Sequence, residues 1–334
     1  MHFDLSDDQQ EIKRTARELL AARSPWEAVR AASEAGRPDE RLWGELRELG
    51  WPGIAVAEEH GGQGLGAVEL AVLLEEHGYA CAATPFLATA TAAAAIQSAG
   101  SPEQQARWLP GLASGERTAA VGRRDLVAGS ADAAVVVLVD GDGAEVLDGA
   151  TAGLEPVQTI DGTRAHARLT GGAEGEPLGA GAAERVTIAL AAEVVGLTQR
   201  ALDMTVEYVK ERKQFGVPVG SFQAVSHRCA QMLLDTETAR STAYFAAWAA
   251  DADADADRLA EAAALAGAAA AGGVRDVTAG AIQAHGGIGF TWEADVHWMY
   301  KRAQLDAALL GGASRHRAAL TRIAASRLAQ PAAS

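Results

Sequence analysis

The sequence predicts a mostly α-helical α+β protein built from three consecutive units. Apolar residues recur at helical spacing in the first third of the chain and again in its second half. β-Branched runs and glycine turns are confined to the stretch between these two parts. Aromatic residues make up only 5% of the 334 residues, so alanine and leucine must fill most of the core, which favours close helix packing.

The first unit, residues 1–117, has the pattern of an N-terminal α-helical domain. Ser6-Asp7-Asp8-Gln9 has the form of a capping box, in which the Ser6 and Gln9 side chains each satisfy a backbone N–H group at a helix start. Apolar spacing predicts helical segments at 12–20, 42–49 and 67–79, and a short capped helix at 101–116.

The second unit, residues 118–181, has the pattern of a small β-domain. Residues 133–147 contain a β-branched run, a turn at Asp142-Gly143 and a second run, which together predict a hairpin. Glycines and short alternating pieces such as 164–169 follow as far as about residue 181. A unit of roughly 60 residues with so many turns is expected to pack on something larger.

The third unit, residues 182–334, predicts an antiparallel four-helix bundle. The helix that ends near residue 309 is expected to start after Phe290, with Thr291 as its N-cap. The acidic stretch "DADADAD" (251–257) is interpreted as a solvated loop between two helices. Long helical runs lie at 183–211, 222–250, 257–285 and 292–309, and a final helix starts at 313.

The composition excludes several classes of function. A net charge of −15 argues against nucleic acid or an anionic membrane as the main partner, although local basic residues can still bind an anionic ligand. Cys81 and Cys229 are far apart, no two histidines are spaced i, i+4 and no HExxH motif occurs, so no metal site is expected. The N-terminus is acidic and no apolar stretch reaches ~18 residues, so we expect a cytoplasmic protein without a membrane span.

One stretch of the third unit, "ERKQFGVPVGSFQAVSHRCAQM" (211–232), carries candidate ligand-binding residues. Arg212 and Lys213 are expected at a helix end, beside Gln214 and Phe215. They are either a basic C-cap that interacts with the helix dipole or an exposed arginine and phenylalanine that bind an anionic, aromatic ligand.

A second stretch, "IQAHGGIGFTWEADVHWMYKRA" (282–303), follows two helices later. A helix ends at Gly286-Gly287, where glycines let the backbone approach a pyrophosphate closely. Taken alone, each stretch is also compatible with a simple helix joint. Taken together, they resemble the acyl-CoA dehydrogenase family, on the residues Arg212-Lys213-Gln214-Phe215-Gly216, Phe222-Gln223, His227, Gln283, Gly286-Gly287-Ile288-Gly289-Phe290 and Lys301-Arg302-Ala303. The segment 49–79 resembles the family's first helical domain, and the resemblance covers nearly all of 3–117 and 182–330.

The resemblance implies a fold and a cofactor. The family has an α-domain, a β-domain and a four-helix bundle in that order, and it binds FAD between the β-domain and the bundles of two neighbouring subunits. In the family's reaction a carboxylate removes the α-proton of an acyl-CoA thioester while the flavin accepts the β-hydrogen as hydride. The residues expected to contact an FAD bound mainly by the partner subunit are Arg212, Gln214 and Phe215, with Gln283, Gly286 and Gly287 at its adenosine-diphosphate half.

The middle domain departs from the family pattern. Family members carry "TEPxxGSD" and "K.WIT" stretches that hold the isoalloxazine ring, and residues 118–181 contain neither. The domain is also about half the usual size, judged from its composition boundaries. It is therefore not expected to build the flavin-ring half of a site by itself.

The catalytic base is the second departure. Many members place a glutamate in a "YEGT" loop, but here Leu310 takes that position and Gly311 follows it. A subset of the family instead uses a glutamate in an "ER" pair at the start of the first bundle helix, which Glu184-Arg185 matches. Glu184 is thus either the candidate catalytic base or a surface residue whose charge is favoured near a helix N-terminus.

These features together resemble the smaller subunit of heteromeric (α2β2) acyl-CoA dehydrogenases of actinobacterial steroid side-chain catabolism. The expected reaction is the α,β-dehydrogenation of an acyl-CoA thioester, by analogy a steroid side-chain CoA. In the expected heterotetramer this chain completes the FAD site of a larger subunit, and electron-transfer flavoprotein or a similar protein accepts the electrons. Two alternatives stay open: an autonomous homomeric dehydrogenase that uses Glu184 as its base, and a non-catalytic assembly subunit.

Overall fold

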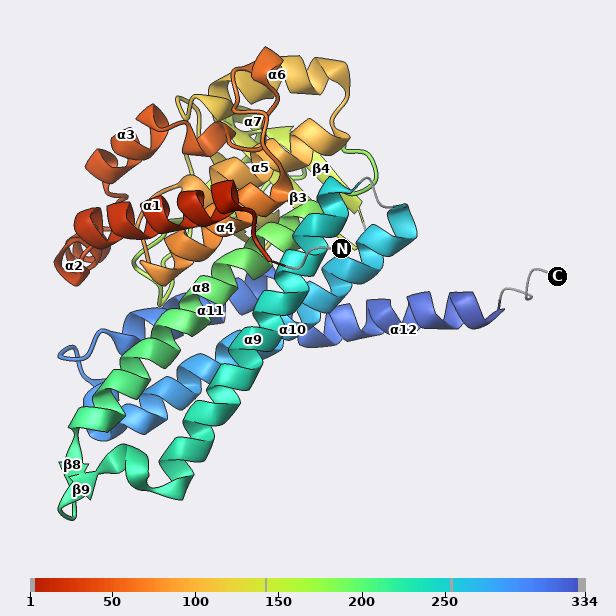
Figure 1. Cartoon of the computed structure of the whole chain (residues 1–334). Helices are drawn as coiled ribbons and strands as arrows, with labels where there is room; N and C mark the ends of the chain where they lie inside the picture. Colours follow the sequence, from red (N-terminus) through yellow and green to blue (C-terminus); the bar gives the residue numbers. More distant parts are fainter. Residues whose placement is uncertain (1–3, 142, 253–254, 330–334) are drawn as a thin grey trace.

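The structure is a computed structural model that describes residues 4–141, 143–252 and 255–329. It confirms the mostly helical α+β architecture, with helices at both ends of the chain and a small sheet between them (Figure 1). In Figure 1 the N-terminal helices lie above a bundle of long helices, and the last helix extends away from the body. Among the helices of these residues, none combines the length and the apolar character needed to cross a membrane.

The N-terminal helices form as the capping signals predict. The Gln9 N–H donates to Ser6 Oγ (3.2 Å), and the Ser6 N–H donates to Gln9 Oε1 (2.9 Å), at the start of the first helix. Ser101 and Gln104 form a second capping box at the start of the sixth helix. The elements are α1 (Asp7–Arg23), α2 (Trp26–Ala35), α3 (Glu40–Glu48), η1 (Trp51–Gly53), η2 (Glu58–His60), α4 (Ala67–Tyr79), α5 (Phe86–Ala99) and α6 (Pro102–Ala113).

The sheet has seven strands in the described residues, in the order β5-β6-β2-β1-β3-β4-β7. β1 and β3 are parallel, and the other neighbouring strands are antiparallel. The predicted hairpin is β3–β4, in which Asp140 pairs with Gly143; Asp142 of the predicted turn lies outside the described residues. The elements are β1 (Ala119–Arg123), β2 (Leu126–Ala128), β3 (Val135–Asp140), β4 (Gly143–Asp148), α7 (Gly149–Ala152), β5 (Leu154–Pro156), β6 (His166–Leu169) and β7 (Glu176–Pro177).

The bundle helices lie within one or two residues of their predicted spans, with one exception. That helix starts at Val296, so the prediction of a start after Phe290 with Thr291 as N-cap was wrong. The Thr291 hydroxyl donates to the Ile288 carbonyl (2.8 Å), because the chain makes a short turn before it enters the helix. The elements are α8 (Ala182–Glu211), β8 (Lys213–Gln214), β9 (Val217–Pro218), η3 (Val219–Ser221), α9 (Gln223–Asp251), α10 (Ala256–His285), η4 (Gly286–Phe290), α11 (Val296–Leu309) and α12 (Ala313–Ala329).

The N-terminal helices and the bundle meet where α4 crosses α8. A Cβ on Gly196 would lie 1.8 Å from the Glu75 carbonyl oxygen, and one on Gly78 would lie 2.2 Å from the Glu193 carbonyl oxygen. Only glycine permits such a close approach of two helix backbones. The crossing therefore fixes α8 against the N-terminal helices, while the other end of α8 extends toward the hairpin β8–β9 (Figure 1).

The start of α4 is capped from the bundle. The two carboxylate oxygens of Asp251, the last residue of α9, accept the N–H groups of Ala67 (2.6 Å) and Val68 (3.0 Å). These N–H groups belong to the first turn of α4, where the helix itself offers them no carbonyl acceptor. The glycine-rich loop 61–66 thus leads into a helix start that the bundle holds in place.

Candidate functional site

An exposed phenylalanine lies at the tip of the hairpin between α8 and α9. β8 and β9 pair in antiparallel register, so Phe215 and Gly216 form the two-residue turn. Both residues have a positive φ, of 55° and 83°, which glycine and asparagine adopt far more easily than phenylalanine. The Phe215 side chain is 94% exposed, and its ring lies edge-on to Phe222 with centroids 6.2 Å apart. A large apolar ring held in solvent by an unfavourable backbone conformation indicates a binding role.

Arg212 and Gln214 lie beside this tip. The Arg212 N–H donates to the Tyr208 carbonyl (2.9 Å), and the Arg212 carbonyl accepts the Val219 N–H (2.7 Å). The Arg212 side chain is exposed and forms no hydrogen bond or ion pair within the described residues. The exposed Gln214 amide donates to the neighbouring Lys213 carbonyl (2.8 Å). The backbone here is fixed, whereas the guanidinium faces solvent.

The end of α10 carries the second group of predicted contacts. Gly286 has a φ of 66° and follows the last residue of the helix. A Cβ on Gly286 or on Gly287 would meet no atom within 4 Å, whereas a Cβ on Gly289 would lie 2.7 Å from the Ile282 carbonyl oxygen. The Gln283 side chain is exposed in the last turn of α10. The glycine pair is therefore an open stretch of backbone that a ligand can approach, and Gly289 serves the packing of the turn.

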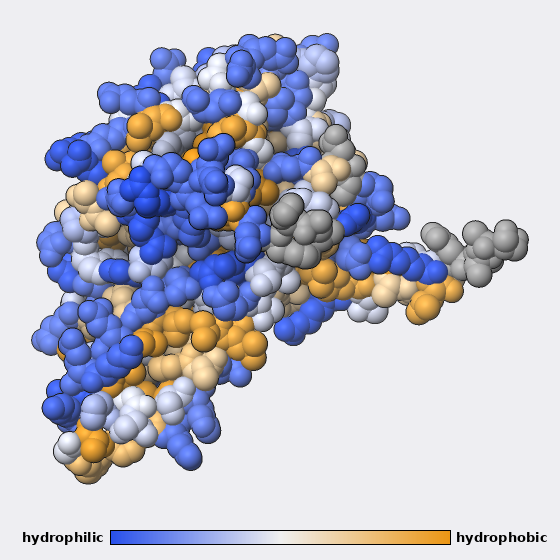
Figure 2. All heavy atoms as spheres, in the orientation of Figure 1, coloured by the Kyte–Doolittle hydropathy of each residue, from blue (hydrophilic) through white to orange (hydrophobic). Residues whose placement is uncertain are grey.

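These two segments lie at the same end of the bundle, where both α8 and α10 end (Figure 1). The Tyr208 ring of α8 stacks on the His285 ring of α10, with centroids 4.4 Å apart. Figure 2 shows apolar side chains gathered over the lower part of the bundle, toward the hairpin. The structure thus brings the six predicted cofactor contacts to one end of the molecule. We name this the bundle-end surface, and its residues are Arg212, Gln214, Phe215, Gln283, Gly286 and Gly287.

Glu184 lies at the opposite end of α8. At about 1.5 Å per residue, the helix between Glu184 and Arg212 is about 40 Å long. The half-buried Glu184 side chain lines a pocket of about 190 Å³ between α8, α10 and α12, together with Arg315 and His316. Glu184 lies in the first turn of α8, and the structure does not bring it to the bundle-end surface of the same chain.

The turn after α11, where many relatives keep their base, is closed by backbone hydrogen bonds. Gly311 and Gly312 have φ values of 77° and 79°, and their N–H groups donate to carbonyls in the last turn of α11 (2.9 and 3.0 Å). The His316 Nε2–H donates to the Leu310 carbonyl (2.8 Å). The Leu310 side chain is only 2% exposed. This turn keeps a tight fold around an apolar side chain.

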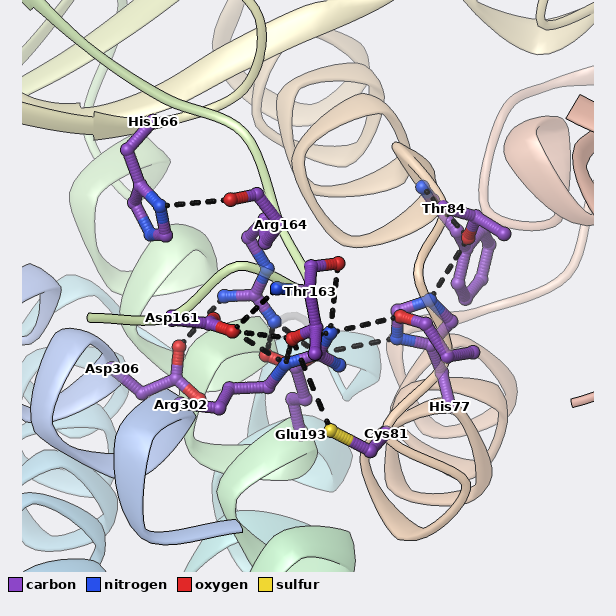
Figure 3. Close-up of polar contacts among 12 residues, drawn as sticks. His77, Cys81, Thr84, Asp161, Thr163, Arg164, His166, Glu193, Arg302 and Asp306 are labelled. Atoms are coloured by element: carbon purple, nitrogen blue, oxygen red, sulfur yellow. Dashed lines mark hydrogen bonds and ion pairs between the residues drawn. The ribbon is translucent and has the colours of Figure 1, made fainter. Parts of the chain in front are cut away.

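A buried cluster of charged residues, not predicted from the sequence, joins the sheet to the bundle (Figure 3). The Arg164 guanidinium donates to both Glu193 carboxylate oxygens (2.5 and 2.6 Å) and to Asp306 Oδ1 (2.7 Å). The Arg302 guanidinium donates to Thr163 Oγ1 (2.6 Å), in the same loop as Arg164. This junction cluster consists of Asp161, Arg164, Glu193, Arg302 and Asp306.

Burial and mutual charge shift the pKa values in the junction cluster. Burial, together with the nearby Glu193 carboxylate, raises the pKa of Asp306 to about 7. Burial also disfavours the charged form of Glu193, but Arg164, His77 and Arg302 outweigh it and hold the pKa of Glu193 well below its usual range. One signal in the sequence points to the cluster: Glu193 interrupts the apolar run 188–197. Within the described residues, the junction cluster included, no three His, Cys, Asp or Glu side chains are grouped so as to hold a metal ion.

Comparison with known proteins matches both ends of the chain to one family. The family model described as "Acyl-CoA dehydrogenase, N-terminal domain" matches residues 6–116, and the model described as "Acyl-CoA dehydrogenase, C-terminal domain" matches residues 181–327. Acyl-CoA dehydrogenase IpdE2 of Mycobacterium tuberculosis is 37% identical over 321 residues, which cover 91% of this chain and 93% of IpdE2. Acyl-CoA dehydrogenase FadE34 of the same organism is 33% identical over 330 residues, which cover 90% of this chain and 45% of FadE34.

Solved structures share the fold over nearly the whole chain. The steroid ACAD Tcur3481-Tcur3483 superimposes with a TM-score of 0.84 at 30% sequence identity, covering 97% of this chain and 99% of that one. The ChsE4-ChsE5 complex from Mycobacterium tuberculosis gives a TM-score of 0.83 at 26% identity, covering 99% of this chain and 100% of that one.

Proposed function

The chain belongs to the acyl-CoA dehydrogenase family of FAD-dependent oxidoreductases, and from this premise we propose that it is one subunit of a hetero-oligomeric dehydrogenase. In the proposed α2β2 heterotetramer it completes the FAD site of a larger sister subunit. The reaction is the α,β-dehydrogenation of an acyl-CoA thioester. The observation that carries the proposal is the bundle-end surface, which has groups suited to one half of an FAD and lies far from Glu184.

The bundle-end surface fits the adenosine-diphosphate half of FAD. The exposed Arg212 guanidinium, without a partner in the described residues, is available to pair with a pyrophosphate. The Gly286 N–H donates to the Gln283 carbonyl, but the backbone at Gly286-Gly287 carries no side chain that would keep phosphate or ribose oxygens at a distance. The exposed Phe215 ring offers an aromatic face to adenine. When bound, FAD supplies the acceptor for the β-hydrogen, and these residues hold and orient its distal half.

Contacts of the chain's own sheet support the proposal that a larger subunit supplies the rest of the FAD site. β1 lies directly against the end of α11, where a Cβ on Gly122 would be 3.0 Å from Leu309 Cδ2. Leu310, the next residue, is buried at the position where many relatives keep their base. By resemblance to the family, the isoalloxazine ring binds between the sheet and the bundle, and residues 118–181 lack the two stretches with which family members hold that ring. We therefore expect the larger subunit to build the ring half of each FAD site.

The substrate and the electron acceptor are proposed by analogy. A steroid ACAD is 30% identical over nearly the whole chain, and we extend its substrate class to this protein as a bulky, steroid-like acyl-CoA. Electron-transfer flavoprotein or a similar protein is the proposed acceptor, and the cytoplasm is the proposed location.

One observation favours a second candidate function, an autonomous dehydrogenase. Glu184 is half-buried in a pocket that His316 also lines, and a carboxylate in such a place can act as a general base. Under this alternative, the chain alone binds FAD and oxidises an acyl-CoA. Glu184→Gln would then abolish turnover while FAD stays bound.

Expression with and without a larger acyl-CoA dehydrogenase from a neighbouring gene tests the proposal. We expect the chain alone to purify without flavin absorbance, and the complex to bind FAD and oxidise an acyl-CoA. Arg212→Ala should release flavin from the complex, whereas Arg317→Ala, which removes an exposed arginine of α12, should not. A yellow, active protein obtained from this chain alone would overturn the proposal in favour of the second candidate.

A further inference from the structure

The bundle-end surface is built from two segments on different helices, and one aromatic pair joins them. Tyr208 of α8 and His285 of α10 stack with centroids 4.4 Å apart and ring planes 17° from parallel. In the part of the chain that the structure describes, no hydrogen bond or ion pair between side chains links the segment 208–222 to the segment 281–295. The stack is thus a directional side-chain contact between the two segments, added to the general packing of α8 on α10.

Each ring is attached directly to one of the two contact segments. The Tyr208 carbonyl accepts the Arg212 N–H (2.9 Å), so the ring and the Arg212 guanidinium belong to the same last turn of α8. His285 immediately precedes Gly286. Any sideways movement of one ring over the other would therefore change the separation between the backbone that carries Arg212 and the open glycine backbone.

The orientation of the His285 ring is fixed from its own helix. Nδ1 lies 2.8 Å from the Ala281 carbonyl oxygen, and because a carbonyl can only accept, Nδ1 carries the hydrogen and donates it. Burial lowers the pKa of His285, so the ring stays neutral at physiological pH. A neutral ring with a fixed plane is a suitable platform for the half-buried Tyr208 side chain.

We propose that Tyr208 and His285 are positioning residues for FAD, whose stack holds Arg212 and the Gly286-Gly287 backbone at the separation that one pyrophosphate group requires. This inference rests on the proposed function, because it assigns a role within the flavin contacts proposed there. Neither ring needs to touch the flavin. Their effect is to hold the distal half of the site in its binding conformation before the cofactor binds, which reduces the conformational entropy lost on binding.

The test measures FAD affinity in the assembled complex with the larger subunit. Tyr208→Leu removes the stack, and we expect it to raise the Kd for FAD about two- to tenfold, the effect of one aromatic pair. Turnover at saturating FAD should stay near the wild-type value. Tyr208→Phe keeps the ring and should keep wild-type affinity. The matched control is Phe245→Leu, which breaks a stack with Trp248 elsewhere on α9 and should leave the Kd unchanged.

The outcomes separate this inference from the proposed function. An unchanged Kd in Tyr208→Leu, while Arg212→Ala releases the flavin, overturns this inference alone. If Arg212→Ala also retains FAD, the bundle-end surface does not bind flavin, and the proposed function fails together with the inference. Weakened binding in Tyr208→Phe overturns the role of the stack, since the hydroxyl would then be responsible. Should Tyr208→Leu fail to assemble, His285→Leu replaces it, with His285→Phe as the rescue and the same criteria.

Discussion

The guanidinium of Arg164 lies 2.5 and 2.6 Å from the two carboxylate oxygens of Glu193. Arg164 comes from the loop before β6 and Glu193 from the middle of α8, so the pair fixes the sheet to the bundle (Figure 3). Asp306 of α11 accepts from the same guanidinium at 2.7 Å. Because all three side chains are buried, water and salt screen these contacts little, and the loss of the Arg164 charge leaves the two carboxylates with only the more distant Arg302 as a buried cation.

Removal of the Arg164 charge should therefore lower the free energy of unfolding much more than the loss of a surface ion pair does. We expect Arg164→Met to lower the free energy of unfolding by about 3–5 kcal/mol, because two buried carboxylates lose their partner. The matched control is Arg168→Met, whose ion pair with Glu155 is exposed and should contribute under about 1 kcal/mol. Urea unfolding of the three proteins measures the difference. Equal losses in the two variants would contradict the assignment of Arg164 as the centre of the junction cluster.

The junction cluster also predicts a pH dependence of stability. The folded pKa of Asp306, raised to about 7 by burial and by Glu193, exceeds the value of about 3.9 in an unfolded chain. Between about pH 4 and 7 the folded state thus binds more protons, and the contribution of Asp306 to stability falls as the pH rises. Asp306→Asn cannot titrate, so it should reduce this fall by up to about 1.4 kcal/mol per pH unit.

Urea unfolding of the wild type and of Asp306→Asn at several values between pH 5 and 7 provides the measurement. Glu193 does not contribute to the slope between pH 5 and 7, because the pKa of Glu193 is lowered. The contribution of Glu193 to stability is lost only as the pH falls through the acid range. Identical slopes for the two proteins would mean that Asp306 titrates in the ordinary range.

The carboxylate that caps α4 from the end of α9 gives the third prediction. Asp251→Ala leaves the Ala67 and Val68 N–H groups without their acceptor, and we expect a loss of about 1–2 kcal/mol in the free energy of unfolding. Asp257→Ala, which removes an exposed carboxylate from the first turn of α10, is the control and should have little effect. A loss below about 0.3 kcal/mol in Asp251→Ala would show that water replaces the cap.

Local patterns in the sequence predict most of the fold, because helix periodicity and capping depend on neighbouring residues. The capping box at Ser6, the short capped helix within 101–116 and the hairpin β3–β4 form as expected. The start of α11 was missed, since the residues after Gly286 form a short turn that hydropathy does not reveal. Trp292, the first residue of the predicted run 292–309, is 73% exposed and lies outside the helix.

The candidate site depends on contacts between distant parts of the chain, which local patterns do not predict. The contact residues were assigned from the family resemblance, and the exposure and turn conformation of Phe215 and the stack of Tyr208 on His285 appear only in three dimensions. The junction cluster could not be predicted, because Arg164 and Glu193 pair across domains and spacing says nothing about such pairs. Glu193, a charge within an apolar run, was the one local signal.

The backbone conformation of Phe215 at the tip of the hairpin predicts that its replacement stabilises the free chain but weakens FAD binding by the complex. Phe215 adopts a φ of 55°, which asparagine adopts far more easily than phenylalanine, so Phe215→Asn should stabilise the free chain by up to about 1 kcal/mol. In the complex the same change removes the proposed aromatic contact to the flavin and should raise the Kd for FAD about tenfold.

Thermal unfolding of the free chain and flavin release from the complex measure the two effects. Phe222→Leu is the control, because it removes the ring that lies edge-on to Phe215 without relieving the turn. A more stable free chain together with unchanged FAD binding would show that the exposed ring serves subunit contact alone. Loss of stability in both states would mean that the turn carries no strain. Only the combination of a stabilised chain and a weakened flavin site agrees with a backbone conformation retained for cofactor binding.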